Sequence, residues 1–336
     1  MRRLYIMALV AIAVATLTVS CNDEWNDEQY TQMVSLMAPR NDDGVTNVYI
    51  RFQTDGTGQY RLPVLVSGST PNASGIDVHV GVDNDTLQIF NVWRFNDRTD
   101  LFYKQLSDKH FSLGDGVCHI NGGSTEAAIP INFDFKGLDL MDNYVLPLKL
   151  EPDASYTINN YKGWDKALLN INIFNDYSGT YSSTTVLVKY AGNNGVSSFA
   201  TTRTAKVVDA STVFFYAGTV WEQDPDRGLY KINATFGPGS KDVTGKTTGK
   251  LTLTAGDAQN RINFATTEDC SYEIEEIMDK QKPYLKHHYV RMTLHYKYKD
   301  ITMNPNKPID VSVNGTMIME RKINTLIPDE DQAIQW

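Results

Sequence analysis

Cys21 is the residue whose surroundings point most directly to chemistry. Arg2 and Arg3 open the sequence, an uncharged and largely apolar stretch covers residues 4–20, and Cys21 follows. A positive start, a short apolar segment and small residues before a cleavage point are typical of a secretory signal. The cysteine indicates a lipoprotein signal, in which residues 1–20 are removed and the thiol is acylated. The alternative is an uncleaved anchor helix, although a span needs about 20 apolar residues.

A run of acidic residues follows this cysteine directly, at Asp23, Glu24, Asp27 and Glu28. The run resembles the surface-export signal of Bacteroidota-type outer-membrane lipoproteins. It therefore favours a lipid-anchored protein on the outer face of the outer membrane. A merely solvated tether is the alternative interpretation.

Carboxylates in the segment 221–228 offer the chemistry of a glycosidase or a calcium site. Glycoside hydrolysis needs two carboxyl groups about 5 to 10 Å apart, and Glu222, Asp224 and Asp226 are candidates. The chain has 40 acidic residues, so such pairs also arise by chance. The same oxygens suit calcium, but the full calcium-loop signature is absent. We therefore predict no enzyme activity, no bound metal and no cofactor.

The histidines do not form a recognisable metal or catalytic motif. His287 and His288 are adjacent, so they point to opposite faces of a regular strand, and His295 lies eight residues beyond His287. At about 3.3 Å per residue that spacing is roughly 26 Å, too far for one ion. The other histidines are His79, His110 and His119. We interpret all six as ordinary strand or surface residues.

Tryptophans on polar segments suggest sugar binding. The apolar face of a pyranose ring stacks on an aromatic ring while polar side chains bind the hydroxyls, which suits an amphipathic, half-wet aromatic. Trp221 is the strongest candidate, because Glu222, Asp224 and Asp226 surround it and Tyr216 and Tyr230 flank its segment. Trp93 and Trp164 are further candidates. A core or hinge role is the alternative for each tryptophan.

Composition narrows the possible partners. The formal net charge is −9, which argues against nucleic acid and against electrostatic attachment to anionic lipid. Beyond Cys21 only Cys118 and Cys270 remain, and we expect both to be buried small residues rather than a disulfide. Membrane contact would therefore come only through the lipid.

The elements that must position these residues are almost all β-strands. Short alternating segments bounded by Gly, Ser, Asn and Pro predict a β-sandwich over residues 46–175, after an acidic, flexible tether over 21–45. Strands are expected at 48–52, 61–66, 76–82, 116–120, 126–133, 144–150 and 167–174. Within the first half, mild helical character is expected only at 99–109.

The second half reads as a series of hairpins over residues 176–324, followed by an acidic, mobile tail over 325–336 from which Trp336 could dock. Alternation from His288 to Tyr298 predicts a long strand, and residues 311–319 repeat it with Gly315 as a bulge or close approach. Residues 273–280 are a candidate short helix. This pattern predicts an antiparallel barrel or a second sandwich.

Five segments carry a resemblance to a known family. Residues 103–113, 117–123 and 144–150 resemble the N-terminal domain of unassigned function found in surface lipoproteins of Bacteroidota polysaccharide-utilisation loci. Residues 176–181 and 313–321 resemble its C-terminal partner domain. The resemblance implies an all-β chain, with an Ig-like sandwich followed by a lipocalin-like barrel. It also implies a glycan-binding protein that sits beside a TonB-dependent importer.

The leading hypothesis is thus a non-catalytic surface lipoprotein that captures an oligosaccharide for an outer-membrane importer. A structural or adhesive surface protein, such as a pilus component or a complex subunit, is the second hypothesis. It predicts a protein partner and no affinity for glycans. A glycoside hydrolase is the third.

Overall fold

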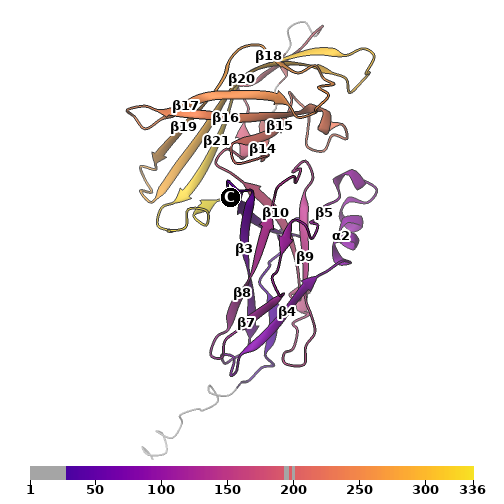
Figure 1. Ribbon diagram of the computed structural model, residues 1–336, viewed down its shortest axis with the longest axis vertical. Coiled ribbons are helices and arrows are strands. Elements are labelled where there is room, and N and C mark those ends of the chain that lie inside the picture. Colours follow the sequence, from indigo (N-terminus) through magenta and orange to yellow (C-terminus); the bar gives the residue numbers. More distant parts are fainter. Residues whose placement is uncertain (1–27, 193–196, 199–200) are drawn as a thin grey trace, which may run out of the picture.

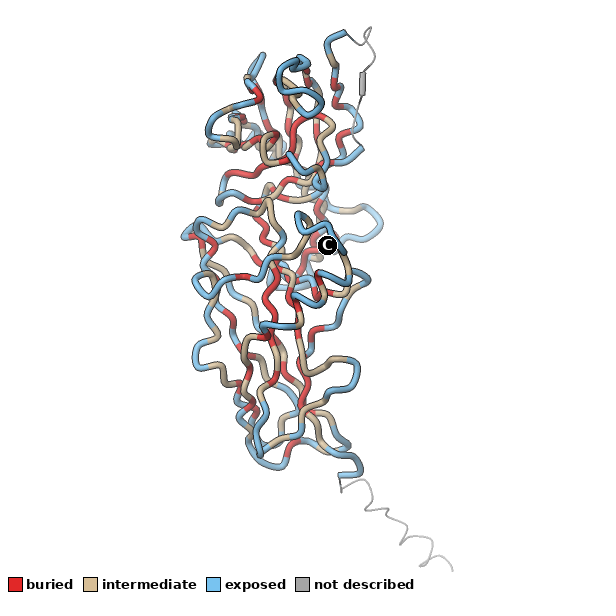
Figure 2. The backbone as a smooth tube through the Cα atoms, turned by 90° about the vertical axis from the view of Figure 1, so that its right-hand side faces the viewer, coloured by how far each residue is buried: buried red, intermediate tan, exposed pale blue. Residues whose placement is uncertain are grey.

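Two β-domains with separate cores make up the protein. The computed structural model describes residues 28–192, 197–198 and 201–336, so Cys21 and Asp23, Glu24 and Asp27 lie outside the described residues. Figure 1 shows a sandwich with a barrel at one end of it, and the described chain begins at the other end. Buried residues run through the middle of both parts in Figure 2.

The sandwich packs two sheets face to face. One sheet has the order β1-β3-β8-β6 and the other β2-β10-β9-β4-β7, with β5 added beside β9. The bounds of the first sheet are β1 Met33–Leu36, β3 Thr57–Ser67, β8 Glu126–Asp134 and β6 Phe111–Ser112. Those of the second are β2 Thr46–Arg51, β10 Lys166–Phe174, β9 Tyr144–Leu150, β4 Ile76–Val82, β7 Val117–Ile120 and β5 Lys104–Gln105. The alternating side chains of both sheets form one core, which includes Leu62, Ile131 and Leu148.

The second domain is an eight-stranded antiparallel barrel. Its ring runs β21-β11-β14-β15-β16-β17-β19-β20 and closes by pairing β20 with β21. The bounds are β11 Gly179–Ser182, β14 Thr202–Val207, β15 Thr212–Tyr216, β16 Lys231–Lys241, β17 Thr247–Ala255, β19 Cys270–Met278, β20 Leu285–Asp300 and β21 Ile309–Asn324. Short strands extend it at β12 Leu187–Tyr190, β13 Ser197–Ser198, β18 Ala265–Thr266 and β22 Ile334–Gln335. The predicted all-β sandwich and barrel are confirmed.

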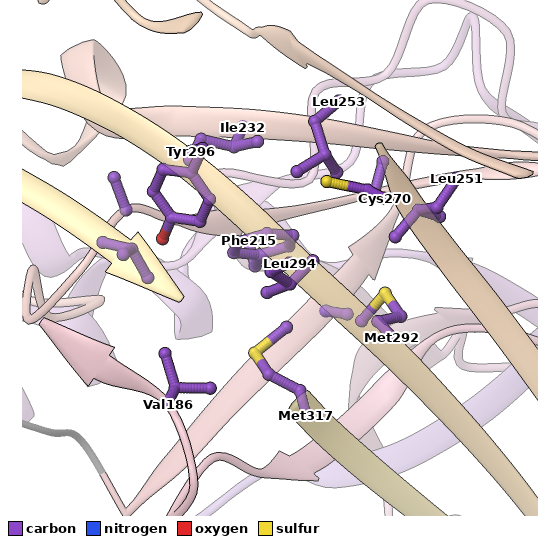
Figure 3. Close-up of a cluster of buried hydrophobic side chains, with 14 of the residues drawn as sticks. Val186, Phe215, Ile232, Leu251, Leu253, Cys270, Met292, Leu294, Tyr296 and Met317 are labelled. Atoms are coloured by element: carbon purple, nitrogen blue, oxygen red, sulfur yellow. The ribbon is translucent and has the colours of Figure 1, made fainter. Parts of the chain in front are cut away.

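Side chains fill the barrel rather than leaving a ligand chamber. Phe215, Met292, Leu294 and Tyr296 are at most 2% exposed and meet at its centre (Figure 3). A hollow beside Phe215 and Tyr296 has a volume of about 10 Å³. A small eight-stranded barrel can be filled in this way or can hold one small ligand. The interior of this barrel therefore leaves no room for a sugar ring.

The chain departs from the predictions at the start of the sandwich. Met33–Leu36, expected in the tether, forms β1 and pairs with β3. Glu28, expected in the same acidic tether, accepts hydrogen bonds from the backbone N–H groups of Ser69 at 2.8 Å and Thr70 at 3.0 Å. Any free tether therefore ends before these contacts, since the chain already follows the sandwich here.

The helix predictions were wrong. Among the described residues the α-helix is α2, Thr86–Phe95, and residues 99–109 contain a short 3₁₀ turn, η2 Thr99–Leu101. Thr, Ile, Phe, Val and Trp are weak helix formers, which hides the signal. The Asp83 carboxylate, which binds the Thr86 hydroxyl at 2.6 Å and Lys166 at 3.0 Å, holds the start of α2.

Two predictions near the C-terminus were also wrong. Residues 273–280 begin within β19, where pairing with both β17 and β20 outweighs the helix preference of glutamate. The tail is not mobile, because Ile334 is buried and β22 pairs with β21. Docking of Trp336 is confirmed: its ring stacks on Tyr49 with centroids 4.1 Å apart.

Other expectations hold. Cys118 and Cys270 are buried and free. The face from Val290 to Tyr298 is buried, as predicted. Pairing of β20 with β21 continues unbroken through Leu294 and Gly315, so Gly315 marks a close approach and not a bulge. A Cβ atom there would collide with the backbone of Thr185 and Val186, and its φ is +147°.

We expect Gly315→Ala to lower the free energy of unfolding by about 2–3 kcal/mol, because the added methyl meets backbone atoms at a strained φ. Urea denaturation followed by tryptophan fluorescence measures it. Gly137→Ala is the matched control, since its φ is +74° but nothing lies within 4 Å of the new Cβ. A loss for Gly315→Ala no larger than the control's would contradict the close approach.

Candidate functional site

Trp221 lies on a folded loop that joins β15 to β16. The carboxylate of Asp224 accepts a hydrogen bond from the Trp221 backbone N–H at 2.7 Å, and the Asp224 N–H donates to the Trp221 carbonyl at 3.1 Å. A second turn follows, because the Arg227 N–H donates to the Asp224 carbonyl at 3.1 Å. These local bonds hold the Trp221 side chain on the surface, 59% exposed.

A hollow of about 400 Å³ lies beside this tryptophan. Its lining is Thr202, Arg203, Thr204, Tyr216, Val220, Trp221, Glu222 and Gln223. The guanidinium carbon of Arg203 stands 5.9 Å from the centre of the Trp221 ring. Such a cation–π contact braces the indole from one side. The hollow therefore combines a partly exposed aromatic ring with hydrogen-bonding groups.

Buried polar groups form the inner wall of the hollow. Tyr216 is 4% exposed, and its hydroxyl has no hydrogen-bond partner among the described residues. Burial raises the pKa of Tyr216 to about 12, so the hydroxyl stays protonated. Arg203 donates to the Gly218 carbonyl, and burial lowers its pKa from the ordinary value. An unsatisfied buried hydroxyl is costly, which makes Tyr216 a candidate ligand contact.

Not all of the predicted site residues meet here. Tyr216, Trp221 and Glu222 line the hollow, and Asp224 supports the loop from within. Asp226 is exposed but does not line the hollow.

Tyr230 is not a platform residue, because it is 1% exposed inside the barrel. Its hydroxyl bonds to Thr302 at 2.8 Å and donates to Asp300 at 3.1 Å.

The other two tryptophans belong to the sandwich. Trp93 lies on α2 and is 74% exposed, whereas Trp164 is half-buried and its carbonyl accepts the Leu36 N–H at 2.8 Å. Neither lines the hollow beside Trp221. They are therefore separate surfaces from the loop site.

Sequence reasoning missed three basic residues and one amide beside the loop. A second hollow, of about 230 Å³, lies between the domains and includes Asn143, Lys206, Glu222, Gln223 and Arg227. Arg203 carries a sequence signal, because it alternates with Ala205 and Val207 on a buried face of β14. Lys206 and Arg227 carry none, because only domain docking brings them to Asn143.

A metal site and a membrane-spanning helix each place requirements on the described residues. Within the described ranges, no group of three or more His, Cys, Asp or Glu side chains is arranged to hold a metal ion. Asp224 was a candidate ligand in the alternative interpretation as a calcium site, and one of its carboxylate oxygens accepts a hydrogen bond from the loop backbone. In the part of the chain that the structure describes, no helix is both long and apolar enough to cross a bilayer.

A buried arginine fixes the junction that shapes these hollows. The Arg321 guanidinium, from β21, donates to the carbonyls of Asn175 at 3.0 Å and Ser178 at 2.8 Å, in the link between domains. It also lies over the rings of Phe174, at 5.5 Å, and Trp336, at 5.4 Å.

Ion pairs across the junction add to this hold. Arg51 of β2 pairs with both Asp176 and Asp331 at 2.6 Å. On the opposite side, Lys231 of β16 binds Asp139 at 2.7 Å, and Arg98 donates to the Gln223 carbonyl at 3.1 Å. The loop that carries Trp221 is therefore tied to the sandwich as well as to the barrel.

Comparison with known proteins places the chain among two-domain proteins of Bacteroides. Residues 25–154 match a domain of unknown function, DUF4973, and residues 165–318 match a second model described only as a C-terminal domain. No match was found among the curated proteins.

Several solved structures are similar over almost their whole length. A multidomain protein including DUF1735 from Bacteroides ovatus is 35% identical, with a TM-score of 0.80, covering 91% of this chain and 100% of its own. A protein described as an auxiliary nutrient binding protein, from Bacteroides thetaiotaomicron, is 34% identical, with a TM-score of 0.76, covering 88% and 97%. A third, of unknown function and from Bacteroides ovatus, is 31% identical, with a TM-score of 0.77, covering 93% and 97%.

We expect Arg321→Met to lower the free energy of unfolding by about 2–3 kcal/mol, because two buried carbonyls lose a charged donor. Urea denaturation measures this loss. Arg261→Ala is the control, since its pair with Asp257 lies at the surface, where solvent screens the charges and an ion pair adds little to stability. Equal losses in the two variants would show that the junction does not depend on Arg321.

Proposed function

The chain belongs to the family of two-domain Bacteroides proteins to which it is similar over nearly their whole length, and on this premise we propose that it is a non-catalytic, surface-exposed glycan-binding lipoprotein. It captures an oligosaccharide and passes it to a neighbouring outer-membrane importer. Cys21 carries the lipid. The loop site around Trp221 makes the first contact with the sugar.

The exposed face of Trp221 is the observation that carries the proposal. An indole that is 59% exposed, braced by Arg203 and next to a 400 Å³ hollow, suits a sugar ring stacked on its free face. The hydroxyl of Tyr216 and the carboxylate of Glu222 then meet the sugar hydroxyls. The filled barrel supports the same location, because it leaves the loop and junction as the concave surfaces.

The relatives support nutrient binding rather than catalysis. One of them is described as an auxiliary nutrient binding protein, and the other two carry no enzyme name. The nutrient of a glycan-capturing lipoprotein would be an oligosaccharide. No pair of carboxylates stands out in the hollow beside Trp221, where Glu222 is the acidic residue of the lining.

The position of the first described residues supports a protein that extends outward from a membrane anchor. The described residues start at the end of the sandwich far from the barrel (Figures 1 and 2). An anchor at Cys21 would therefore hold the sandwich near the membrane and the barrel away from it. The loop site lies at the junction and on the barrel, where a glycan in the medium could reach it.

Trp221→Ala should weaken glycan binding by about 1 kcal/mol or more, because the stacking surface is lost. A glycan array on residues 22–336 selects the ligand, and calorimetry measures the affinity of the variant. Trp93→Ala is the matched control, because it removes another surface tryptophan, 74% exposed on α2 against 59% for Trp221. Unchanged affinity in Trp221→Ala, or an equal loss in both variants, would remove the loop from the site.

Cys21→Ala should shift the protein from the membrane fraction to the soluble fraction, because the acylated thiol is the proposed anchor. Fractionation of cells that express the full chain, followed by protease treatment of intact cells, measures attachment and exposure. Cys118→Ala serves as the control for loss of a thiol. Retention of Cys21→Ala in the membrane would favour the uncleaved anchor helix instead.

A further inference from the structure

Three cationic side chains around the loop site have no acidic partner. Among the described residues, Arg203, Lys206 and Arg227 form no ion pair with a carboxylate within 4 Å, although the chain as a whole carries a net charge of −9. Buried or half-buried cations are usually paired. A bound anionic group would therefore stabilise these unpaired positive charges.

Lys206 stands at the centre of this concentration. It is half-buried on β14, lies in the wall of the 230 Å³ hollow, and also lines a neighbouring hollow of about 320 Å³. Its Nζ atom donates to the Asn143 side-chain oxygen at 3.2 Å, across the domain junction. Burial lowers the pKa of Lys206 from its ordinary value. A neutral amide is a poor substitute for the water that the ammonium has lost.

Among the described residues, neither arginine donates a hydrogen bond to a carboxylate. Arg227 is 8% exposed and donates to the carbonyls of Asp224 at 3.2 Å and Asp100 at 3.3 Å, while its Nε has no partner among the described residues. Arg203 donates to the carbonyls of Gly218 and Thr202. The positive charge of each guanidinium thus stays uncompensated.

Nearby carboxylates are already committed elsewhere. Asp142 pairs with Lys104 at 2.5 Å, Asp139 with Lys231 at 2.7 Å and Asp100 with Arg98 at 2.8 Å. Asp224 accepts from the Trp221 backbone. Glu222 remains: it is exposed and lines both the Trp221 hollow and the Lys206 hollow. Asp43, which also lines the Lys206 hollow, pairs with Arg94. Among the described carboxylates that line the two hollows, Glu222 is therefore the uncommitted one that the three cations face.

We propose that the ligand is an acidic oligosaccharide, one of whose uronate carboxylates or sulfate esters binds beside Lys206, Asn143 and Arg227 while a sugar ring stacks on Trp221. This rests on the proposed function and names the substrate class of the same site. The two hollows share Glu222 and Gln223, so a single chain of sugars can occupy both. Charged hydrogen bonds make the acidic group the main source of specificity.

Two variants that should change the affinity for an acidic ligand in opposite directions test this inference. A glycan array with uronate-bearing, sulfated and neutral oligosaccharides selects the ligand, and calorimetry then compares it with its carboxyl-reduced or desulfated derivative. Lys206→Met should weaken binding of the acidic ligand tenfold or more and leave the neutral derivative unchanged. Glu222→Gln should tighten binding of the acidic ligand, because it removes a like charge. Lys206→Arg keeps the positive charge and should therefore retain at least part of the affinity. It shows whether the affinity lost in Lys206→Met is lost because the charge is removed.

The outcomes separate this inference from the proposed function. Hits that are all neutral, or an acidic ligand whose affinity is the same for Lys206→Met and the unaltered protein, would overturn the inference and leave glycan binding intact. Absence of any glycan hit would overturn both. Thermal unfolding of each variant ensures that a loss of affinity does not reflect a loss of fold. The carboxylate and sulfate arms of the array decide which anion binds.

Discussion

The docking of the barrel against the end of the sandwich is the constraint on which the rest of the structure depends. Arg321 reaches from the barrel into the link at Asn175 and Ser178, and Trp336 closes over it from the C-terminus. A guanidinium at this position satisfies two carbonyls that the link would otherwise bury unpaired. The strands before and after the link are therefore held at one relative orientation. The hollows at the junction exist because of that orientation.

Because side chains fill the barrel, its candidate binding residues lie on a loop at its edge. An eight-stranded ring that is packed with Phe215, Met292 and Tyr296 acts as a rigid support, as a sandwich core does. The loop after β15 takes its shape from Asp224 and its position from contacts with the sandwich through Arg98 and Arg227. Rigid elements thus hold this loop at the surface, and surface loops are where binding residues are commonly found.

Strand alternation was the reliable signal in this sequence, and local propensity was the unreliable one. The buried face from Val290 to Tyr298 was predictable, because side chains alternate between the two faces of a strand whichever strand pairs with it. The helix α2 was missed because its residues are weak helix formers and its start depends on Asp83 and Lys166, which lie 83 residues apart. The segment 273–280 was predicted as a helix because glutamates favour one, whereas two neighbouring strands impose β19.

The sequence by itself determined the all-β architecture, the Trp221 loop as a candidate site and the expectation of an anchor at Cys21, because alternation, polar loop aromatics and signal patterns are local. Only the tertiary structure decided which candidates meet. It buried Tyr230, separated Trp93 and Trp164 from the loop, and brought Lys206 to Asn143. Those outcomes depend on contacts between segments that are distant in the sequence. The sequence could not show that Lys206 is half-buried without an ion-pair partner among the described residues, because both facts depend on how the two domains pack.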